Sequence, residues 1–163
     1  MEFVNREPID ELAALGMPIP EEIVINHGAA LVIWGIRNER LNGDIDAATS
    51  LENNLYLEES LGFTALQMAV GISQEGKERT VVSRRDGNER FDIHRWDFSM
   101  YRYNRTKKGR MYLPELGTMS VQDPKTGIWV LKPAGVRLTM LETGRPQDEE
   151  MIPVIDDYLA NTA

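Results

Sequence analysis

Two aspartates spaced two residues apart are the side chains in this sequence best suited to chemistry. Asp44 and Asp46 follow Gly43 in the stretch "GDIDA", which has the pattern of a short strand. Alternate residues of a strand share a face, so the two carboxylates would project together while Ile45 points into the core. Carboxylates this close repel each other unless a cation lies between them, and hard oxygen ligands suit Mg²⁺ or Mn²⁺. A solvated edge strand is the alternative interpretation.

A third carboxylate occurs in the run "RFDIH", where Asp92 lies between Phe91 and Ile93. The apolar neighbours would anchor a strand in the core and direct Asp92 to the other face. Three carboxylates on neighbouring strands could hold two metal ions about 4 Å apart, the arrangement used for in-line phosphoryl transfer. Asp44 and Asp46 would then bridge both ions, and Asp92 would hold the ion that activates the attacking hydroxyl.

The choice of Asp92 has alternatives in the sequence itself. Asp92 could instead form a salt bridge with Arg90 or Arg95. Asp97 also has apolar neighbours and is a rival third carboxylate. On one continuous strand Asp97 and Asp92 point to opposite faces, so only one of them can face the metal ions.

Helices are predicted where apolar residues recur at helical spacing between capping residues. Pro8 and the acids that follow it indicate a helix start, and Gly62 and Gly144 are placed to end two later helices. Pro153 indicates a kink or a break in the last helix. The predicted helical segments are 8–15, 29–36, 50–62, 134–144 and 146–163.

Strands are predicted from β-branched runs and from turn residues between them. The run at 21–26 is followed by a turn at His27-Gly28, and a second short strand covers 44–47. Asp86-Gly87 is a favoured hairpin pair, and a second hairpin spans 119–132. Residues 63–73 fit either helix or strand. The predicted fold class is therefore α/β of the α+β kind, a small mixed β-sheet flanked by helices, in a single domain over residues 1–163.

Composition excludes several classes of protein. The 163 residues carry a formal net charge of -8 and no cysteine, which argues against a general nucleic-acid binder and against disulfide, thiolate zinc and thiol-nucleophile chemistry. The only two histidines, His27 and His94, make a histidine-rich metal site improbable. No signal peptide and no apolar run long enough to span a membrane are visible, so we expect no membrane association and a cytoplasmic location.

The charge is unevenly distributed along the chain. Residues 77–110 hold 11 of the 18 Lys and Arg residues but only 5 of the 26 acids, a local net charge of +6. Aromatic residues are interleaved with these arginines, a pattern suited to stacking and phosphate contact. Arg84 and Arg85 beside the first hairpin turn are the candidates for contact with an RNA acceptor. A strand with an apolar inner and a basic outer face gives the same alternation.

Taken together, these motifs resemble the minimal nucleotidyltransferases of the polymerase-beta superfamily, especially the abortive-infection toxin type. The family pattern is an apolar residue and a glycine, a spacer, Asp-apolar-Asp, and a third carboxylate on a later strand. Gly28 in "INHGAALVIWGI", Asp44 and Asp46 in "GDID", and Asp92 in "RFDIH" match it. The resemblance spans roughly residues 22–158.

Further positions match or depart from the family. Gly35 and Arg40 can fill the places of a spacer glycine and arginine, and Arg145 and Asp148 match the start of the family's last helix. Ala29 stands where the family commonly has glycine or a hydroxyl residue. Asn42 replaces a threonine, and Gln147 replaces a lysine.

The resemblance implies a nucleotidyltransferase that uses Mg²⁺ or Mn²⁺ and a nucleoside triphosphate. Its catalytic and metal residues would be Asp44, Asp46 and Asp92, and the nucleotide would lie against Gly28, Ala29, Arg84 and Arg145. Gly28 would let backbone N–H groups approach a phosphate. The acceptor would be a hydroxyl of protein or RNA, and a toxin module would have an antitoxin protein as a partner. The alternative is a catalytically degenerate domain of this fold that binds a nucleotide or a partner protein.

Overall fold

The described strands of the chain join in one seven-stranded sheet. The computed structural model describes residues 2–38, 45–68, 80–85, 88–95, 116–143 and 145–162. The strands lie side by side in the order β3-β4-β5-β2-β1-β7-β6. In chain order they are β1 (Ile23–Asn26), β2 (Ile45–Thr49), β3 (Phe63–Met68), β4 (Thr80–Arg85), β5 (Asn88–Arg95), β6 (Ser120–Gln122) and β7 (Trp129–Leu131).

The sheet is mixed, as the sequence predicted. β2 pairs with β5, and β1 with β7, in parallel, whereas the other neighbouring strands are antiparallel. The described helical segments that flank it are α1 (Glu7–Ala13), the 3₁₀ turn η1 (Pro20–Glu22), α2 (His27–Ile33), α3 (Leu51–Leu61), α4 (Leu116–Met119), α5 (Pro133–Thr143) and α6 (Pro146–Thr162). None of the described helices combines the length and the apolar character that crossing a membrane requires.

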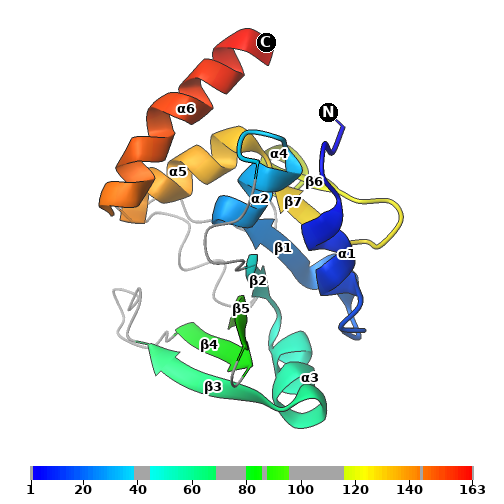
Figure 1. Ribbon diagram of the computed structural model, residues 1–163. Coiled ribbons are helices and arrows are strands. Elements are labelled where there is room, and N and C mark those ends of the chain that lie inside the picture. Colours follow the sequence, from blue (N-terminus) through cyan, green and yellow to red (C-terminus); the bar gives the residue numbers. More distant parts are fainter. Residues whose placement is uncertain are drawn as a thin grey trace.

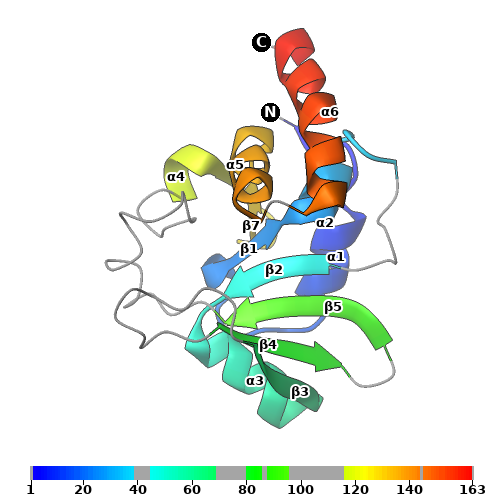
Figure 2. The ribbon, with the colours of Figure 1, turned by 90° about the vertical axis from the view of Figure 1, so that its left-hand side faces the viewer.

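The helices divide between the two ends of the sheet. Figure 1 shows α3 beside β3 and β4 at one end, with α2, α5 and α6 at the other end near β1 and β7. The same division is seen after a quarter turn in Figure 2, where the C-terminal part of α6 projects away from the sheet. The central strands β5, β2 and β1 therefore lie between the end of the sheet near α3 and the end near α2, α5 and α6.

The most buried helix is α2, whose residues are apolar on every side. Ala29, Ala30, Leu31 and Ile33 are each at most 1% exposed. Trp34 follows directly, and its indole Nε1 donates a 2.8 Å hydrogen bond to the carbonyl oxygen of Leu131 on β7. Burial of both the ring and its one donor fixes the end of α2 against the sheet.

Most predicted elements are confirmed where the structure describes them. Gly62 ends α3 in the left-handed conformation with φ of 70°, and both predicted hairpins form as antiparallel pairs. Residues 63–68, which the sequence left ambiguous, are the strand β3. The predicted turn residues Asp86 and Gly87 lie outside the described residues.

Two expectations need correction. His27 and Gly28 do not form a separate turn, because α2 already begins at His27. Asn26 caps this helix by accepting a hydrogen bond from the His27 backbone N–H, and His27 takes φ of 48° at the junction. Pro153 does not break the last helix, which runs from Pro146 to Thr162. The short segments η1 and α4 were not predicted.

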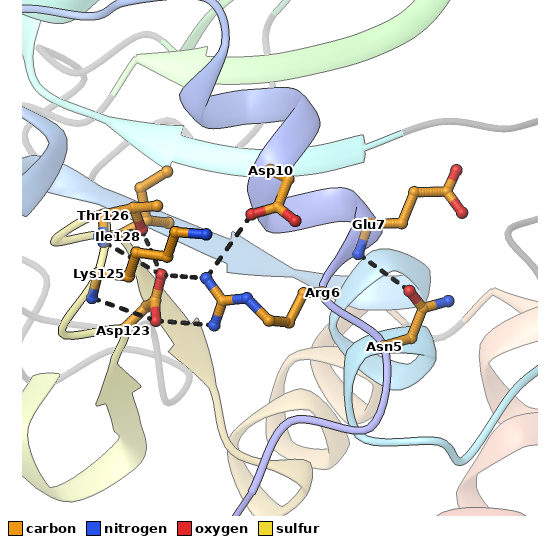
Figure 3. A network of polar contacts seen from close by, with 8 residues as sticks. All are labelled: Asn5, Arg6, Glu7, Asp10, Asp123, Lys125, Thr126 and Ile128. Carbon is orange, nitrogen blue, oxygen red and sulfur yellow. Dashed lines mark hydrogen bonds and ion pairs between the residues drawn. The ribbon is translucent and has the colours of Figure 1, made fainter.

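An N-terminal clasp, defined by Val4, Asn5, Arg6 and Asp123, ties the start of the chain to the second hairpin. The backbone N–H groups of Val4 and Asn5 donate to the carbonyl oxygen of Ile33, at 2.8 and 3.1 Å. The Arg6 guanidinium donates two hydrogen bonds, of 2.9 and 2.8 Å, to the carboxylate of Asp123, as Figure 3 shows. The clasp therefore closes over the carboxyl end of α2.

Candidate functional site

Four polar residues occupy directly paired positions in one row across the central strands. Arg84 pairs with Asp92, Asp92 pairs with Asp46, and Asp46 pairs with Asn26. Directly paired residues of neighbouring strands occupy the same face of a sheet. We call Arg84, Asp92, Asp46 and Asn26 the polar row. It joins two predicted metal ligands with one predicted nucleotide contact, although Asp46 and Asp92 are 46 residues apart in the chain.

The alternation of β2 explains how Asp46 reaches this face. Ile45, Ala47 and Thr49 are at most 2% exposed, and Asp46 and Ala48 between them are half-buried. This is the pattern expected of a strand with an apolar core face. The prediction that Ile45 points into the core is thus confirmed, as is the strand position of Asp46. Asp44 lies outside the described residues.

Asn26 connects the polar row to the helical side of the molecule. Its side-chain Oδ1 accepts a hydrogen bond of 2.7 Å from the backbone N–H of His27. The Thr139 hydroxyl of α5 lies 3.4 Å from the same oxygen. Sequence reasoning missed Asn26, although a polar residue that ends the apolar run "IVIN" was a usable signal. The row therefore ends between the start of α2 and the side of α5.

Arg145 lies immediately before α6, and its guanidinium is held by a carboxylate of that helix. It forms a two-pronged ion pair with Asp148, with Nε to Oδ2 at 2.8 Å and Nη2 to Oδ1 at 3.1 Å. This hydrogen bonding raises the pKa of Arg145, and the charge of Asp46 raises it further. Asp148 is 3% exposed, whereas the Arg145 side chain is half-exposed. The charge of Arg145 is therefore held in place and remains accessible to solvent.

The two residues of α2 that were predicted to contact the nucleotide, Gly28 and Ala29, have different surroundings. Ala29 is 1% exposed and belongs to the core, so only its backbone could contact a ligand. At Gly28, a Cβ atom would lie 3.0 Å from Nη1 of Arg37. The space that this glycine leaves is therefore occupied by a guanidinium, which sequence reasoning did not predict. Arg37 belongs to the segment after α2, and no local sequence pattern indicates that this segment folds back over Gly28.

Two aspartates occupy paired positions in the row, and carboxylate oxygens are ligands that divalent cations prefer. Neighbouring strands are about 4.8 Å apart, so aspartates paired across them have carboxylates close enough to share one ion. Hard oxygen ligands of this kind suit Mg²⁺ or Mn²⁺. Among the side chains that the structure describes, no group of three metal-ligating residues lies together. Those side chains do not include Asp44 or Asp92, so the metal set remains a prediction.

The chain has little similarity to known proteins. No protein-family model matches the chain, and no similar sequence was found among curated proteins. One structure found by comparison is the crystal structure of the Megavirus polyadenylate synthase, with a TM-score of 0.43 and 11% sequence identity. The match covers 95% of this chain and 34% of the viral protein, so this chain spans about a third of its length. A likeness this low carries no inference about activity.

Proposed function

We propose that this protein is a metal-dependent nucleotidyltransferase that moves a nucleotidyl group from a nucleoside triphosphate to a hydroxyl. The observation that carries the proposal is the register between β2 and β5, which pairs Asp46 directly with Asp92. Like charges at paired positions are unfavourable in a sheet unless a cation lies between them. The sequence resemblance to minimal nucleotidyltransferases gives this pairing its chemical interpretation.

The proposed reaction needs a group that accepts the proton of the acceptor hydroxyl, and a carboxylate of this chain can do so. The acceptor oxygen forms a bond to the α-phosphorus of the triphosphate, pyrophosphate leaves, and the hydroxyl proton must be removed. Asp92 is the carboxylate proposed to take that proton, and Asp44 and Asp46 would hold the cation with it. A bound Mg²⁺ or Mn²⁺ would neutralise charge that develops on the reacting oxygens.

Two arginines have positions near the paired aspartates. Arg84 occupies the position next to Asp92 in the polar row, and Arg145 lies close enough to Asp46 for its pKa to respond to that carboxylate. Guanidinium groups pair well with phosphate oxygens and carry their charge at every physiological pH. We therefore propose that Arg84 and Arg145 contact the triphosphate. Gly28 would let the backbone N–H groups beside it approach a phosphate.

The first test is whether nucleotide and metal bind together. Each of the four nucleoside triphosphates with Mg²⁺ should raise the melting temperature, and ligand at about 100 times Kd adds about 2.7 kcal/mol of stability. Asp46→Asn should lose this metal-dependent shift. Asp156→Asn is the matched control, because Asp156 is an exposed aspartate of α6 that pairs with Arg137. No shift with any triphosphate would contradict the proposal.

The second test follows the label from an α-phosphate-labelled triphosphate into acceptors. RNA and protein hydroxyls are the two acceptor classes to compare, and an antitoxin protein that blocks transfer would place the chain among toxin modules. Transfer that Asp46→Asn abolishes supports an enzyme. Binding without transfer to either acceptor would favour the alternative, a catalytically degenerate domain. Ala29, which lacks the hydroxyl common at its position, is the feature consistent with that alternative.

A further inference from the structure

The side chain of Arg37 lies near the candidate site, and the interactions described for it do not explain its position. It is half-buried, and its Nη1 lies over Gly28 in the first turn of α2. Among the residues that the structure describes, no carboxylate forms an ion pair with it. Its backbone N–H, in contrast, is engaged with the carbonyl oxygen of Leu31. The main chain of Arg37 is therefore anchored, and its guanidinium makes no ion pair within the part of the chain that the structure describes.

The position of Gly28 brings this guanidinium close to the polar row. Gly28 follows Asn26 by two residues, so their Cα atoms are at most about 7 Å apart. Asn26 is paired with Asp46, and paired Cα atoms of antiparallel strands are about 5 Å apart. Arg37 is thus near the end of the row opposite to Arg84.

The chemistry of the site gives this guanidinium a partner. A cation held by Asp46 and Asp92 would draw triphosphate oxygens to the row, and those oxygens need donors on their outer side. A guanidinium presents its N–H groups in a planar fork that matches phosphate oxygens. We propose that Arg37 binds the phosphate groups of the nucleoside triphosphate, and that Gly28 provides the space for it. This inference rests on the proposed function and names a specific nucleotide-binding residue for it.

Gly28 is explained by the same arrangement. A Cβ at this position would meet Nη1 of Arg37 at 3.0 Å, which is tighter than most real contacts. The atom that must move is the far end of a flexible side chain, so Gly28→Ala should fold. Alanine also has a higher helix propensity than glycine. The variant should therefore keep or gain stability while it displaces the guanidinium.

The test compares triphosphates with nucleosides. We would measure, by calorimetry, the binding of each Mg²⁺–nucleoside triphosphate and of the matching nucleoside. Arg37→Gln should weaken triphosphate binding by about tenfold to a hundredfold, as expected for loss of a charge-assisted hydrogen bond, and leave nucleoside binding unchanged. Arg37→Lys should recover part of the loss. Arg137→Gln, at a half-exposed arginine of α5, is the control and should change neither affinity.

A double-mutant cycle tests the role of Gly28. Gly28→Ala should weaken triphosphate binding in the wild-type background and add nothing in the Arg37→Gln background, because the two changes remove the same contact. Equal losses in both backgrounds would overturn the claim that Gly28 acts through Arg37. Melting temperatures of all variants would show that each one folds.

The outcomes separate this inference from the proposed function. If wild-type protein binds triphosphate with Mg²⁺, Asp46→Asn loses that binding and Arg37→Gln keeps it, then Arg37 is not a phosphate contact while the proposed function stands. If Arg37→Gln weakens triphosphate and nucleoside equally, its effect is on the fold and the inference is also overturned. If wild-type protein binds no triphosphate, both proposals are overturned.

Discussion

Two aspartates of this chain, Asp123 and Asp46, lie in different surroundings. Asp123 of the N-terminal clasp is 1% exposed and accepts hydrogen bonds from Arg6 and from the Thr126 hydroxyl. Asp46 is half-buried, and its neighbour in the polar row is another aspartate. Figure 3 shows how closely Asp123 is surrounded by donors. The Asp123 carboxylate is held by donors of its own chain, whereas Asp46 lies beside a second aspartate position in the sheet.

The pKa of Asp123 shows how strongly its surroundings favour the charged carboxylate. Hydrogen bonding from Arg6 lowers the pKa of Asp123 from 3.8 to about 2, against the opposing effect of burial. Like charges at directly paired positions of a sheet, such as those of Asp46 and Asp92, are unfavourable. The charged form of Asp123 is therefore stabilised by Arg6 over the whole range above its folded-state pKa.

The largest expected effect is on nucleotidyl transfer at the row. Asp92→Ala should reduce transfer by at least about a hundredfold, the lower range for loss of a general base. Nucleotide and metal binding should survive in part, because Asp44 and Asp46 remain. Asp97→Ala should keep most of the activity. The measurement is single-turnover transfer of labelled nucleotide with both variants side by side.

The reverse pattern, with near-normal turnover for Asp92→Ala and lost turnover for Asp97→Ala, would mean that Asp97 is the third carboxylate. Asp92 pairs directly with Asp46 between β5 and β2. Asp97 lies outside the described residues.

The next largest effect is on stability at the clasp. Arg6→Met removes the guanidinium from a carboxylate that is 1% exposed, and breaking a buried ion pair in this way should cost about 3 kcal/mol. The control is Arg137→Met, which breaks the exposed pair with Asp156 and should cost less than about 1 kcal/mol. Urea unfolding of both variants gives the two values, and equal values would contradict the distinction between the pairs.

A third prediction concerns acid unfolding. Because the pKa of Asp123 is lower in the folded state, its contribution is fully present above about pH 4 and is lost as the pH falls toward 2. The shift from 3.8 to about 2 corresponds to about 2 kcal/mol. Asp123→Asn should therefore show a shallower loss of unfolding free energy over this window than wild type. Parallel curves for the two proteins would count against the assignment.

The smallest expected effect is on the metal-free stability of the row. Asp46→Asn removes a repulsion from the paired Asp92 position and an attraction to Arg145, so the free energy of unfolding without metal should change by less than about 1 kcal/mol. Chemical denaturation in the presence of a chelator measures it. A loss of more than about 1 kcal/mol would show that Asp46 is a structural aspartate like Asp123.

Local signals were sufficient to predict most of the fold and part of the site. Gly62 at the end of α3 and the alternation around Asp46 each depend on neighbours within a few residues, and both predictions are confirmed. The ion pair between Arg145 and Asp148, one turn apart, also follows from local spacing.

The remaining features depend on contacts between distant segments. The pairing of Asp46 with Asp92 requires a parallel register between strands that are far apart in the chain, which periodicity cannot fix. The position of Arg37 over Gly28 depends on how the segment after α2 folds back, and that segment has no distinctive residue pattern. Arg6 and Asp123 are 117 residues apart, so their pairing was equally beyond local reasoning.

The most direct test of the central claim is a crystal structure of the protein with a nucleoside triphosphate and Mg²⁺, repeated with Mn²⁺ to identify the metal by anomalous scattering. The account predicts an ion at the polar row, within about 2.1 Å of a carboxylate oxygen of Asp46, with Asp92 and the phosphates completing its ligands. A bound triphosphate with no metal ion at Asp46 and Asp92 would contradict the account.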